Sequence, residues 1–192
     1  MYQRKIIANI AEAMTDTPVI LLAGARQTGK STLMQSLVNA DTPTHYCTLD
    51  NPETYAAVLA NPHGFISSHT GTLCIDEVQR APDLFLAIKH AVDKDRTPGR
   101  FLLTGSANVL LIPRLSESLA GRMEIVTLRP LAQLEMAQVA QMAQSGRAVN
   151  LIDAWFDAGH TLPKYAAVDR EDFVHRLLIG GYPEVVARSS PK

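Results

Sequence analysis

The chain has 192 residues, of which 46% are hydrophobic and 19% charged, a composition that excludes a disordered chain and suffices for one domain with a sizeable core. Its 18 Lys and Arg residues against 19 Asp and Glu give a net charge of -1, so net charge does not support nucleic acid or acidic lipid as a partner. Two cysteines cannot form a disulfide framework and no apolar run reaches the length of a membrane-spanning helix, so we expect a cytoplasmic protein without a membrane partner.

Short apolar runs alternate with helical patterns through the first two thirds of the chain. The first run, 18–23, is followed by a helical face of Leu33, Met34 and Leu37, and the second, 45–49, by a short helix over 52–59. A third run, 72–75, precedes a helix that carries Leu84, Ile88 and Val92 on one face. The fourth and fifth runs are 100–104 and 123–128. Strands separated by helical crossovers predict an α/β fold, a three-layer sandwich with a parallel sheet between helices.

The last third of the chain has a different pattern. An Ala-, Gln- and Met-rich stretch predicts a helix over 130–144, and a second helix is predicted over 170–179, ended by Gly180 and Gly181. We therefore expect two domains: a core of residues 1–129, and a small helical appendage of residues 130–192.

Residues 24–31 match the phosphate-loop pattern G-x-x-x-x-G-K-[ST] without a mismatch. Gly24 and Gly29 are expected to adopt backbone angles that let the loop wrap a phosphate, with successive N–H groups pointing inward. Lys30 can reach the β- and γ-phosphates of ATP, and the Ser31 hydroxyl can ligate Mg²⁺. The predicted nucleotide-binding residues are Gly24, Ala25, Arg26, Gln27, Thr28, Gly29, Lys30, Ser31 and Thr32.

The third predicted strand ends in two carboxylates, Asp76 and Glu77. At the carboxyl edge of a parallel sheet these would face the crevice in which ligands bind. We expect Asp76 to hold Mg²⁺, directly or through water, and Glu77 to polarise the attacking water, because a carboxylate can accept its proton. The alternative is a pair of solvated turn residues.

Three polar residues at the end of the fourth strand are candidates to contact the γ-phosphate or the water. They are Thr104, Ser106 and Asn108, of which Ser106 is preferred as a catalytic residue. The alternative for this position is a hydroxyl that caps the following helix.

Together these segments resemble the AAA-type ATPases of the P-loop superfamily. More narrowly, they are similar to prokaryotic ATP-binding proteins whose AAA domain precedes a C-terminal domain of unknown function. The residues that carry the likeness are 24–32, 46–52, 73–79, 103–106, 118–122, 130–131 and 180–184. Members generally continue beyond the last of these segments, so we expect residues 130–192 to be a truncated appendage and carry over no function of the missing part.

The resemblance implies a sheet order of 5-1-4-3-2, with the helical appendage as a lid. It also implies that Arg122, just before the fifth strand, is an arginine finger. At the start of that strand Arg122 is expected to lie too far from its own nucleotide, so we expect it to act on a neighbouring subunit's ATP, which would require self-association. The alternative for Arg122 is a helix-terminal arginine that neutralises nearby carbonyl groups.

The leading function is binding of ATP with Mg²⁺ and its hydrolysis, used to drive a conformational switch. One alternative is a nucleotide-gated module that binds protein or DNA and hydrolyses ATP negligibly. A P-loop kinase is a second alternative, disfavoured because Glu77 beside Asp76 suits water activation. A GTPase is disfavoured because the sequence has no Asn-Lys-x-Asp segment.

Overall fold

The computed structural model describes residues 2–38, 43–106, 108–109, 119–136 and 169–189 of the chain. By their internal contacts, the residues form two compact units. One unit is Lys5–Pro130, and the other combines Met1–Arg4 with Leu131–Lys192.

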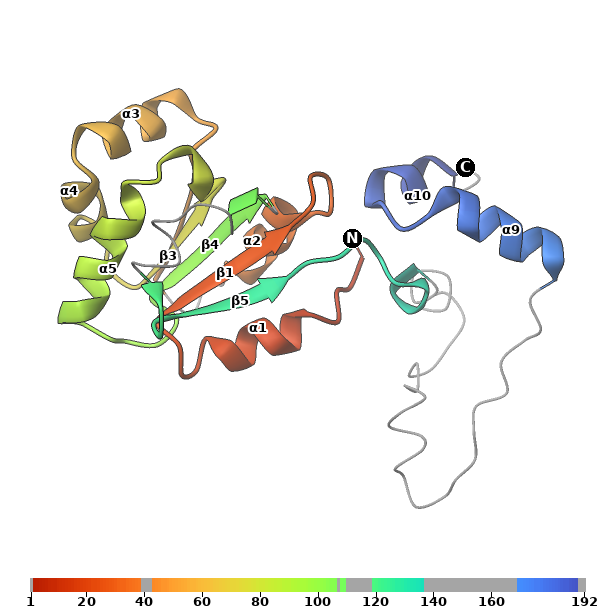
Figure 1. Cartoon of the computed structure of the whole chain (residues 1–192), viewed down its shortest axis with the longest axis horizontal. Coiled ribbons are helices and arrows are strands. Elements are labelled where there is room, and N and C mark those ends of the chain that lie inside the picture. The colour runs from red at the N-terminus through yellow and green to blue at the C-terminus, as the bar shows by residue number, and fades with distance from the viewer. Residues whose placement is uncertain (1, 39–42, 107, 110–118, 137–168, 190–192) are drawn as a thin grey trace, which may run out of the picture. The chain divides into compact units, whose positions relative to one another are not determined.

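The larger unit is built on a parallel sheet with the strand order β2-β3-β4-β1-β5 (Figure 1). The strands are β1 Val19–Gly24, β2 Thr44–Thr48, β3 Thr72–Asp76, β4 Phe101–Ser106 and β5 Met123–Thr127. This order is the predicted 5-1-4-3-2 counted from the opposite edge, so the predicted fold class is confirmed. Strand ends differ from the predicted ones by one or two residues.

Six helical segments of this unit lie wholly in the described residues. They are α1 Ile7–Ala13, α2 Lys30–Leu37, α3 Pro52–Ala60, α4 Pro62–Ser67, the 3₁₀ turn η1 Val78–Arg80, and α5 Leu84–Lys94. The helices α2, α3 and α5 were predicted, whereas α1, α4 and η1 were not. The side chain of Asn51 caps α3, accepting hydrogen bonds from the N–H groups of Glu53 and Thr54.

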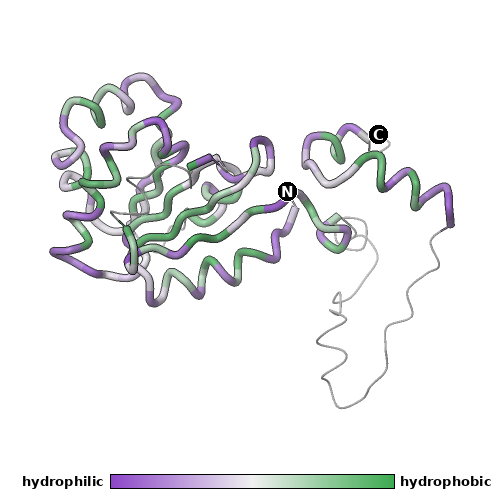
Figure 2. The backbone as a smooth tube through the Cα atoms, viewed as in Figure 1, coloured by the Kyte–Doolittle hydropathy of each residue, from purple (hydrophilic) through white to green (hydrophobic). Residues whose placement is uncertain are grey.

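Successive side chains along each strand point to opposite faces of the sheet, so the core has two layers, one on each face. On β1, Val19 and Leu21 belong to the cluster packed with α3, α4 and α5, whereas Ile20 and Leu22 belong to the cluster packed with α1 and α2. Figure 2 shows the strands as a continuous hydrophobic band inside this unit. Since both faces are covered, the carboxyl edge of the sheet is where polar residues can meet a ligand.

The described residues of the smaller unit include three helical segments. Residues 133–136 are helical, and the remainder of the helix predicted over 130–144 lies outside the described residues. The predicted helix over 170–179 is confirmed as α9 Arg170–Ile179, which ends at Gly180 with a φ of +66°. A further helix, α10 Pro183–Ser189, follows it. No helix in the described part of either unit is long and apolar enough to cross a membrane.

Candidate active site

The phosphate-loop residues connect the end of β1 to the start of α2. Gly29 has a φ of +91° and occupies the N-cap position of α2, where it offers no side chain to the free N–H groups of the first turn. Gln27 also adopts a left-handed conformation, with a φ of +62°. These N–H groups and the positive end of the helix dipole are therefore available to an anion.

Gly24 is required for a reason other than the predicted one. Its φ is not positive, so the expectation of a special backbone angle was wrong for this residue. A Cβ at this position would lie 2.4 Å from the backbone oxygen of Leu128. The segment after β5 approaches closely because the Leu128 N–H donates a 2.7 Å hydrogen bond to the Ala23 oxygen. Gly24 thus allows two strand ends to meet beside the loop.

Lys30 is held under the loop, and its side chain is only 5% exposed. Its Nζ donates hydrogen bonds to the backbone oxygens of Gly24, at 3.2 Å, and Ala25, at 2.9 Å. Burial lowers the pKa of Lys30, and the nearby carboxylates of Glu77 and Asp76 partly oppose this effect. The ammonium group is therefore already positioned inside the loop that would surround a phosphate.

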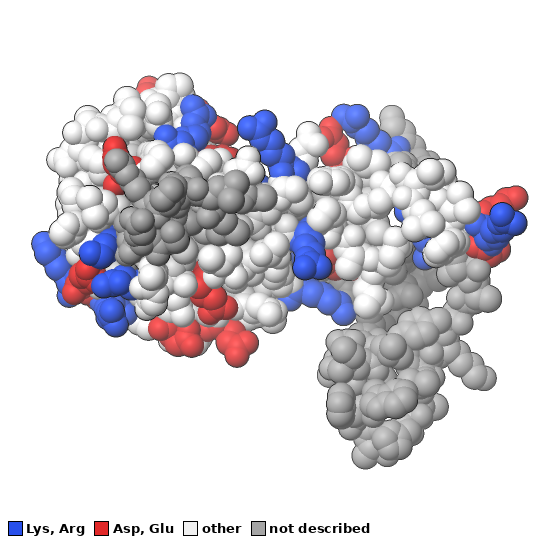
Figure 3. Space-filling view, viewed as in Figure 1, with Lys and Arg blue, Asp and Glu red and all other residues white. Residues whose placement is uncertain are grey.

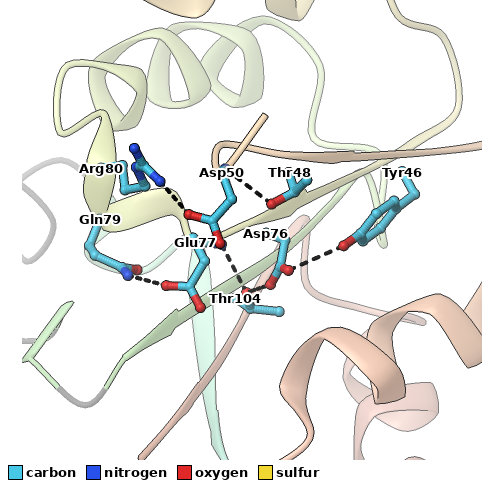
Figure 4. Close-up of polar contacts among 8 residues, drawn as sticks. All are labelled: Tyr46, Thr48, Asp50, Asp76, Glu77, Gln79, Arg80 and Thr104. Atoms are coloured by element: carbon cyan, nitrogen blue, oxygen red, sulfur yellow. Dashed lines mark hydrogen bonds and ion pairs between the residues drawn. The ribbon is translucent and has the colours of Figure 1, made fainter. Parts of the chain in front are cut away.

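Asp76 is the last residue of β3, and neighbouring strands hold both of its carboxylate oxygens (Figure 4). Tyr46 on β2 donates from its hydroxyl to Oδ2 at 3.2 Å, and Thr104 on β4 donates to Oδ1. The carboxylate is 4% exposed. These contacts fix its orientation and leave further lone pairs that can accept from a ligand.

Glu77 begins the turn after β3 in a left-handed conformation, with φ +58° and ψ +42°. For a residue with a Cβ this conformation is uncommon and costs energy, which the surrounding contacts must offset. One such contact is the hydrogen bond from the Glu77 N–H to Thr104 Oγ1 at 3.1 Å. The single hydroxyl of Thr104 therefore connects both members of the acidic pair.

We predict that Thr104→Val lowers the free energy of unfolding by about 1–3 kcal/mol, because it leaves Asp76 Oδ1 and the Glu77 N–H without the Thr104 hydroxyl at nearly unchanged volume. Urea denaturation measures the loss. Thr127→Val is the matched control, since Thr127 is exposed on β5 of the same sheet and its replacement should stay within about 0.5 kcal/mol. Equal effects of the two changes would mean that the Thr104 hydroxyl does not hold the acidic pair.

A cavity of about 470 Å³ brings the loop and the acidic turn together. Its lining residues are Arg26, Gln27, Gly29, Lys30, Ser31, Thr32, Asp50, Glu77, Gln79 and Arg80. Among the predicted loop residues, Gly24, Ala25 and Thr28 are not part of this lining, and the Thr28 hydroxyl instead donates to the Ala25 oxygen at 2.9 Å. The Asp76 carboxylate lies outside the lining too, in contact with Thr104.

Ser106, the preferred candidate on β4, is not among the cavity residues. It ends the strand, where its Cα pairs in register with that of Gly24. Thr104 is fully buried and contacts the acidic pair. Of the candidates on this strand, Thr104 is the one that the structure joins to the site, and the role of Ser106 stays a prediction.

Arg122 lies at the amino ends of the strands, whereas the phosphate loop lies at their carboxyl ends. It directly precedes β5, whose first residue Met123 pairs with Val19 at the start of β1. Five residues of strand, at about 3.3 Å each, separate the two ends by about 16 Å. Arg122 Nε pairs with Asp93 Oδ1 at 2.6 Å, and this hydrogen bond lowers the pKa of Asp93. Its own chain's loop is thus out of reach, and a role in a neighbouring subunit stays a prediction.

Three cavity residues were not proposed as site residues from the sequence: Asp50, Gln79 and Arg80. Gln79 donates from Nε2 to Glu77 Oε2, and its buried Oε1 has no hydrogen-bond partner in the described part of the structure. Arg80 forms an ion pair with Asp50. Asp50 and Gln79 lie in segments that carried the family resemblance, whereas Arg80 directly follows such a segment and no signal in the sequence pointed to it.

The charges around the cavity are of both signs. Arg26, Lys30 and Arg80 supply positive groups, and Asp50 and Glu77 supply negative ones. On the face shown in Figure 3, basic and acidic side chains are interspersed over the described residues. Among the described residues visible on that face, no extended basic surface of the kind that binds a nucleic-acid backbone is seen.

Comparison with known proteins places these features in a family. A family model described as an AAA domain matches residues 16–137, which include the loop, the acidic pair and Thr104. Two uncharacterised proteins, of Mycobacterium bovis and Mycobacterium tuberculosis, are each 42% identical to the chain over 140 residues. The match covers 72% of this chain and 31% of each relative, so the chain spans about a third of the length of these curated relatives.

Proposed function

The chain belongs to the family of AAA domains, and from this premise we propose that it binds ATP with Mg²⁺ and hydrolyses it to drive a conformational switch. We further propose residues 1–129 as the nucleotide-binding domain and residues 130–192 as a helical lid. The observation that carries the proposal is the cavity in which Lys30, Ser31 and Glu77 meet. It combines a phosphate cradle with a carboxylate that can act on water.

The donor set supports Mg²⁺ bound together with phosphate. Mg²⁺ prefers oxygen ligands and usually binds through one or two carboxylates plus substrate phosphates and water. Ser31 and Asp76 offer a hydroxyl and a carboxylate of this kind. In the described residues no group of three or more His, Cys, Asp or Glu side chains could hold a metal without a phosphate. When bound, the ion would offset negative charge on the β- and γ-phosphates.

The chain's own residues would divide the hydrolytic step between them. The loop N–H groups and Lys30 would bind the β- and γ-phosphates and stabilise charge that grows during transfer. Water would form the new bond to the γ-phosphorus as the bond to the ADP oxygen breaks, with the bonding electrons passing to ADP. Glu77 would accept the proton of the water. Gln79 Nε2 donates a hydrogen bond to Glu77 Oε2, so we assign the proton transfer to the other carboxylate oxygen, Glu77 Oε1.

Phosphate release from ATP tests the proposal directly. We expect Mg²⁺-dependent release of inorganic phosphate, abolished by a chelator, when purified protein is assayed at several concentrations with and without DNA. A phosphorylated acceptor formed without free phosphate would instead indicate a kinase. Tight ATP binding without release of phosphate would indicate the nucleotide-gated binding module.

The predicted role of Arg122 in a neighbouring subunit is tested by mixing two variants. Arg122→Ala and Glu77→Gln chains, each impaired alone, are expected to recover partial activity together, because one supplies the arginine and the other the water-activating carboxylate. Activity per wild-type chain should also rise with protein concentration. No recovery, once association of the two chains has been confirmed, would leave Arg122 as the partner of Asp93 that the structure shows.

A further inference from the structure

Arg80 lies on the acidic side of the cavity, in contact with two groups that a ligand can displace. It ends the η1 turn, and its N–H donates to the Glu77 backbone oxygen at 3.1 Å, so its position depends on that of Glu77. Its guanidinium pairs with the Asp50 carboxylate and lies 5.2 Å from the centroid of the Tyr55 ring. The Arg80 and Asp50 side chains are 44% and 64% exposed.

Such a pair holds a cation in place without binding it strongly. Exposed ion pairs contribute little in water, because solvent screens the charges and two side chains must be ordered. A polyphosphate carries more negative charge than a single carboxylate and accepts both arms of a guanidinium at once. A ligand phosphate at the Glu77 end of the cavity would therefore compete with Asp50 for Arg80.

The positions of the other cationic residues leave the Glu77 end of the cavity to Arg80. Lys30 enters the cavity from the phosphate loop, and Arg122 lies at the other, amino-terminal ends of the strands. Arg26 also lines the cavity, but it belongs to the loop itself. Arg80 is the cationic cavity residue on the same turn as Glu77, three positions after it, and it lines the same cavity as the carboxylate that we assign to the water.

We propose that Arg80 leaves Asp50 when ATP binds and contacts the γ-phosphate of its own chain, where it serves as a catalytic cation. Asp50, with the Tyr55 ring, holds Arg80 while no nucleotide is present. The inference rests on the proposed function, since it assigns the γ-phosphate to the cavity formed by the loop and the acidic turn. A cation that meets charge growing on the γ-phosphate oxygens binds the transition state more strongly than bound ATP.

The first experiment compares single-turnover phosphate release with nucleotide affinity for Arg80→Ala and Arg80→Lys. Arg80→Ala is expected to slow release by about 10²-fold, the usual effect of losing one donor to a developing charge. Arg80→Lys should recover only part of the rate, because an ammonium lacks the planar fork. Arg96→Ala, an exposed arginine in the loop after α5 and away from the cavity, is the matched control. A normal rate for Arg80→Ala would overturn the catalytic role.

The second experiment asks whether Arg80 is held by Asp50. Asp50→Asn is expected to speed release a few-fold in the wild-type background, and to have no such effect when Arg80 is already Ala. A gain that persists without Arg80 would show that Asp50 acts by its own charge. Mixing Arg80→Ala with Glu77→Gln should give no recovery, because both side chains act within one chain. Recovery would overturn the assignment to the chain's own nucleotide.

A binding measurement separates this inference from the proposed hydrolysis. The wild type should bind a non-hydrolysable ATP analogue more tightly than ADP, and Arg80→Ala should lose that preference while binding ADP normally. If the wild type releases no phosphate but its preference for the ATP analogue depends on Arg80, the proposed hydrolysis is wrong and the contact between Arg80 and the γ-phosphate is supported. If the wild type hydrolyses ATP and Arg80→Ala keeps both the rate and the preference, the inference alone fails.

Discussion

Replacing Glu77 by Gln is expected to slow ATP hydrolysis by about 10²–10⁴-fold while binding of ATP with Mg²⁺ is retained, the range that general acid–base catalysis contributes. The amide keeps the size of the side chain but cannot accept the proton of the attacking water. The backbone of Glu77 should not change, because its left-handed conformation is supported by the Thr104 hydroxyl, which contacts the N–H and not the side chain. The loss should therefore appear in kcat.

Single-turnover phosphate release and direct titration with ATP measure the two quantities separately. Glu12→Gln, which changes an exposed carboxylate on α1, is the matched control and should leave both unchanged. Normal turnover of Glu77→Gln would show that another group activates the water, and Glu77 would then be a cavity carboxylate that accepts a hydrogen bond from Gln79. Loss of ATP binding in Glu77→Gln would mean that Glu77 contributes to the affinity for the nucleotide.

The central strands of the sheet could be predicted because they are buried on both faces, whereas the edge strands β2 and β5 are only partly buried. β1 is an unbroken apolar run, as expected of a central parallel strand, and β4 begins with the apolar run 101–103; both are buried along almost their whole length. Helix α1 was missed because it is only seven residues long and begins without a side-chain N-cap, so the sequence carries no clear start signal for it. In the structure Ile10 and Ala13, three residues apart, form its buried side. Two buried positions within seven residues are too few to establish a helical period from the sequence.

Much of the candidate site was predictable where its residues are contiguous in the sequence. The phosphate loop is a single stretch whose spacing specifies the chemistry, and the acidic pair ends a single strand. The choice between Thr104 and Ser106 was different, because residues two apart on a strand share a face. The register decides it: Ile75 pairs with Leu103, so Thr104 lies level with Asp76 and Ser106 lies beyond it.

The contact between Asp50 and Arg80 depends on long-range topology. Thirty positions separate them in the sequence. They meet because β2 and β3 are parallel neighbours in the sheet, and Asp50 and Arg80 lie in the turns that follow the carboxyl ends of these two strands. Neither residue stands out by composition, and an exposed Asp and Arg are ordinary surface residues. Only the shared cavity shows that both belong to the site.

Replacing Lys30 by Ala is expected to weaken ATP binding by about 3 kcal/mol, or about 10²-fold, because charge-assisted hydrogen bonds to the phosphates are lost. The ammonium is already inside the loop, bonded to the oxygens of Gly24 and Ala25, so little ordering is needed when phosphate arrives. Its lowered pKa has burial as the main cause, and a bound phosphate would favour the charged form. Isothermal titration with ATP and ADP measures the loss.

Because Lys30 is buried, the variant must be shown to fold. Lys30→Met keeps the length and apolar volume of the side chain, so equal loss of ATP affinity in Lys30→Ala and Lys30→Met would assign the effect to the charge. Lys94→Ala, at the exposed end of α5, is the matched control for a lost surface cation and should bind ATP normally. Unchanged ATP affinity in folded Lys30→Met would mean that the loop does not bind phosphate, and the assignment of the whole cavity would be wrong.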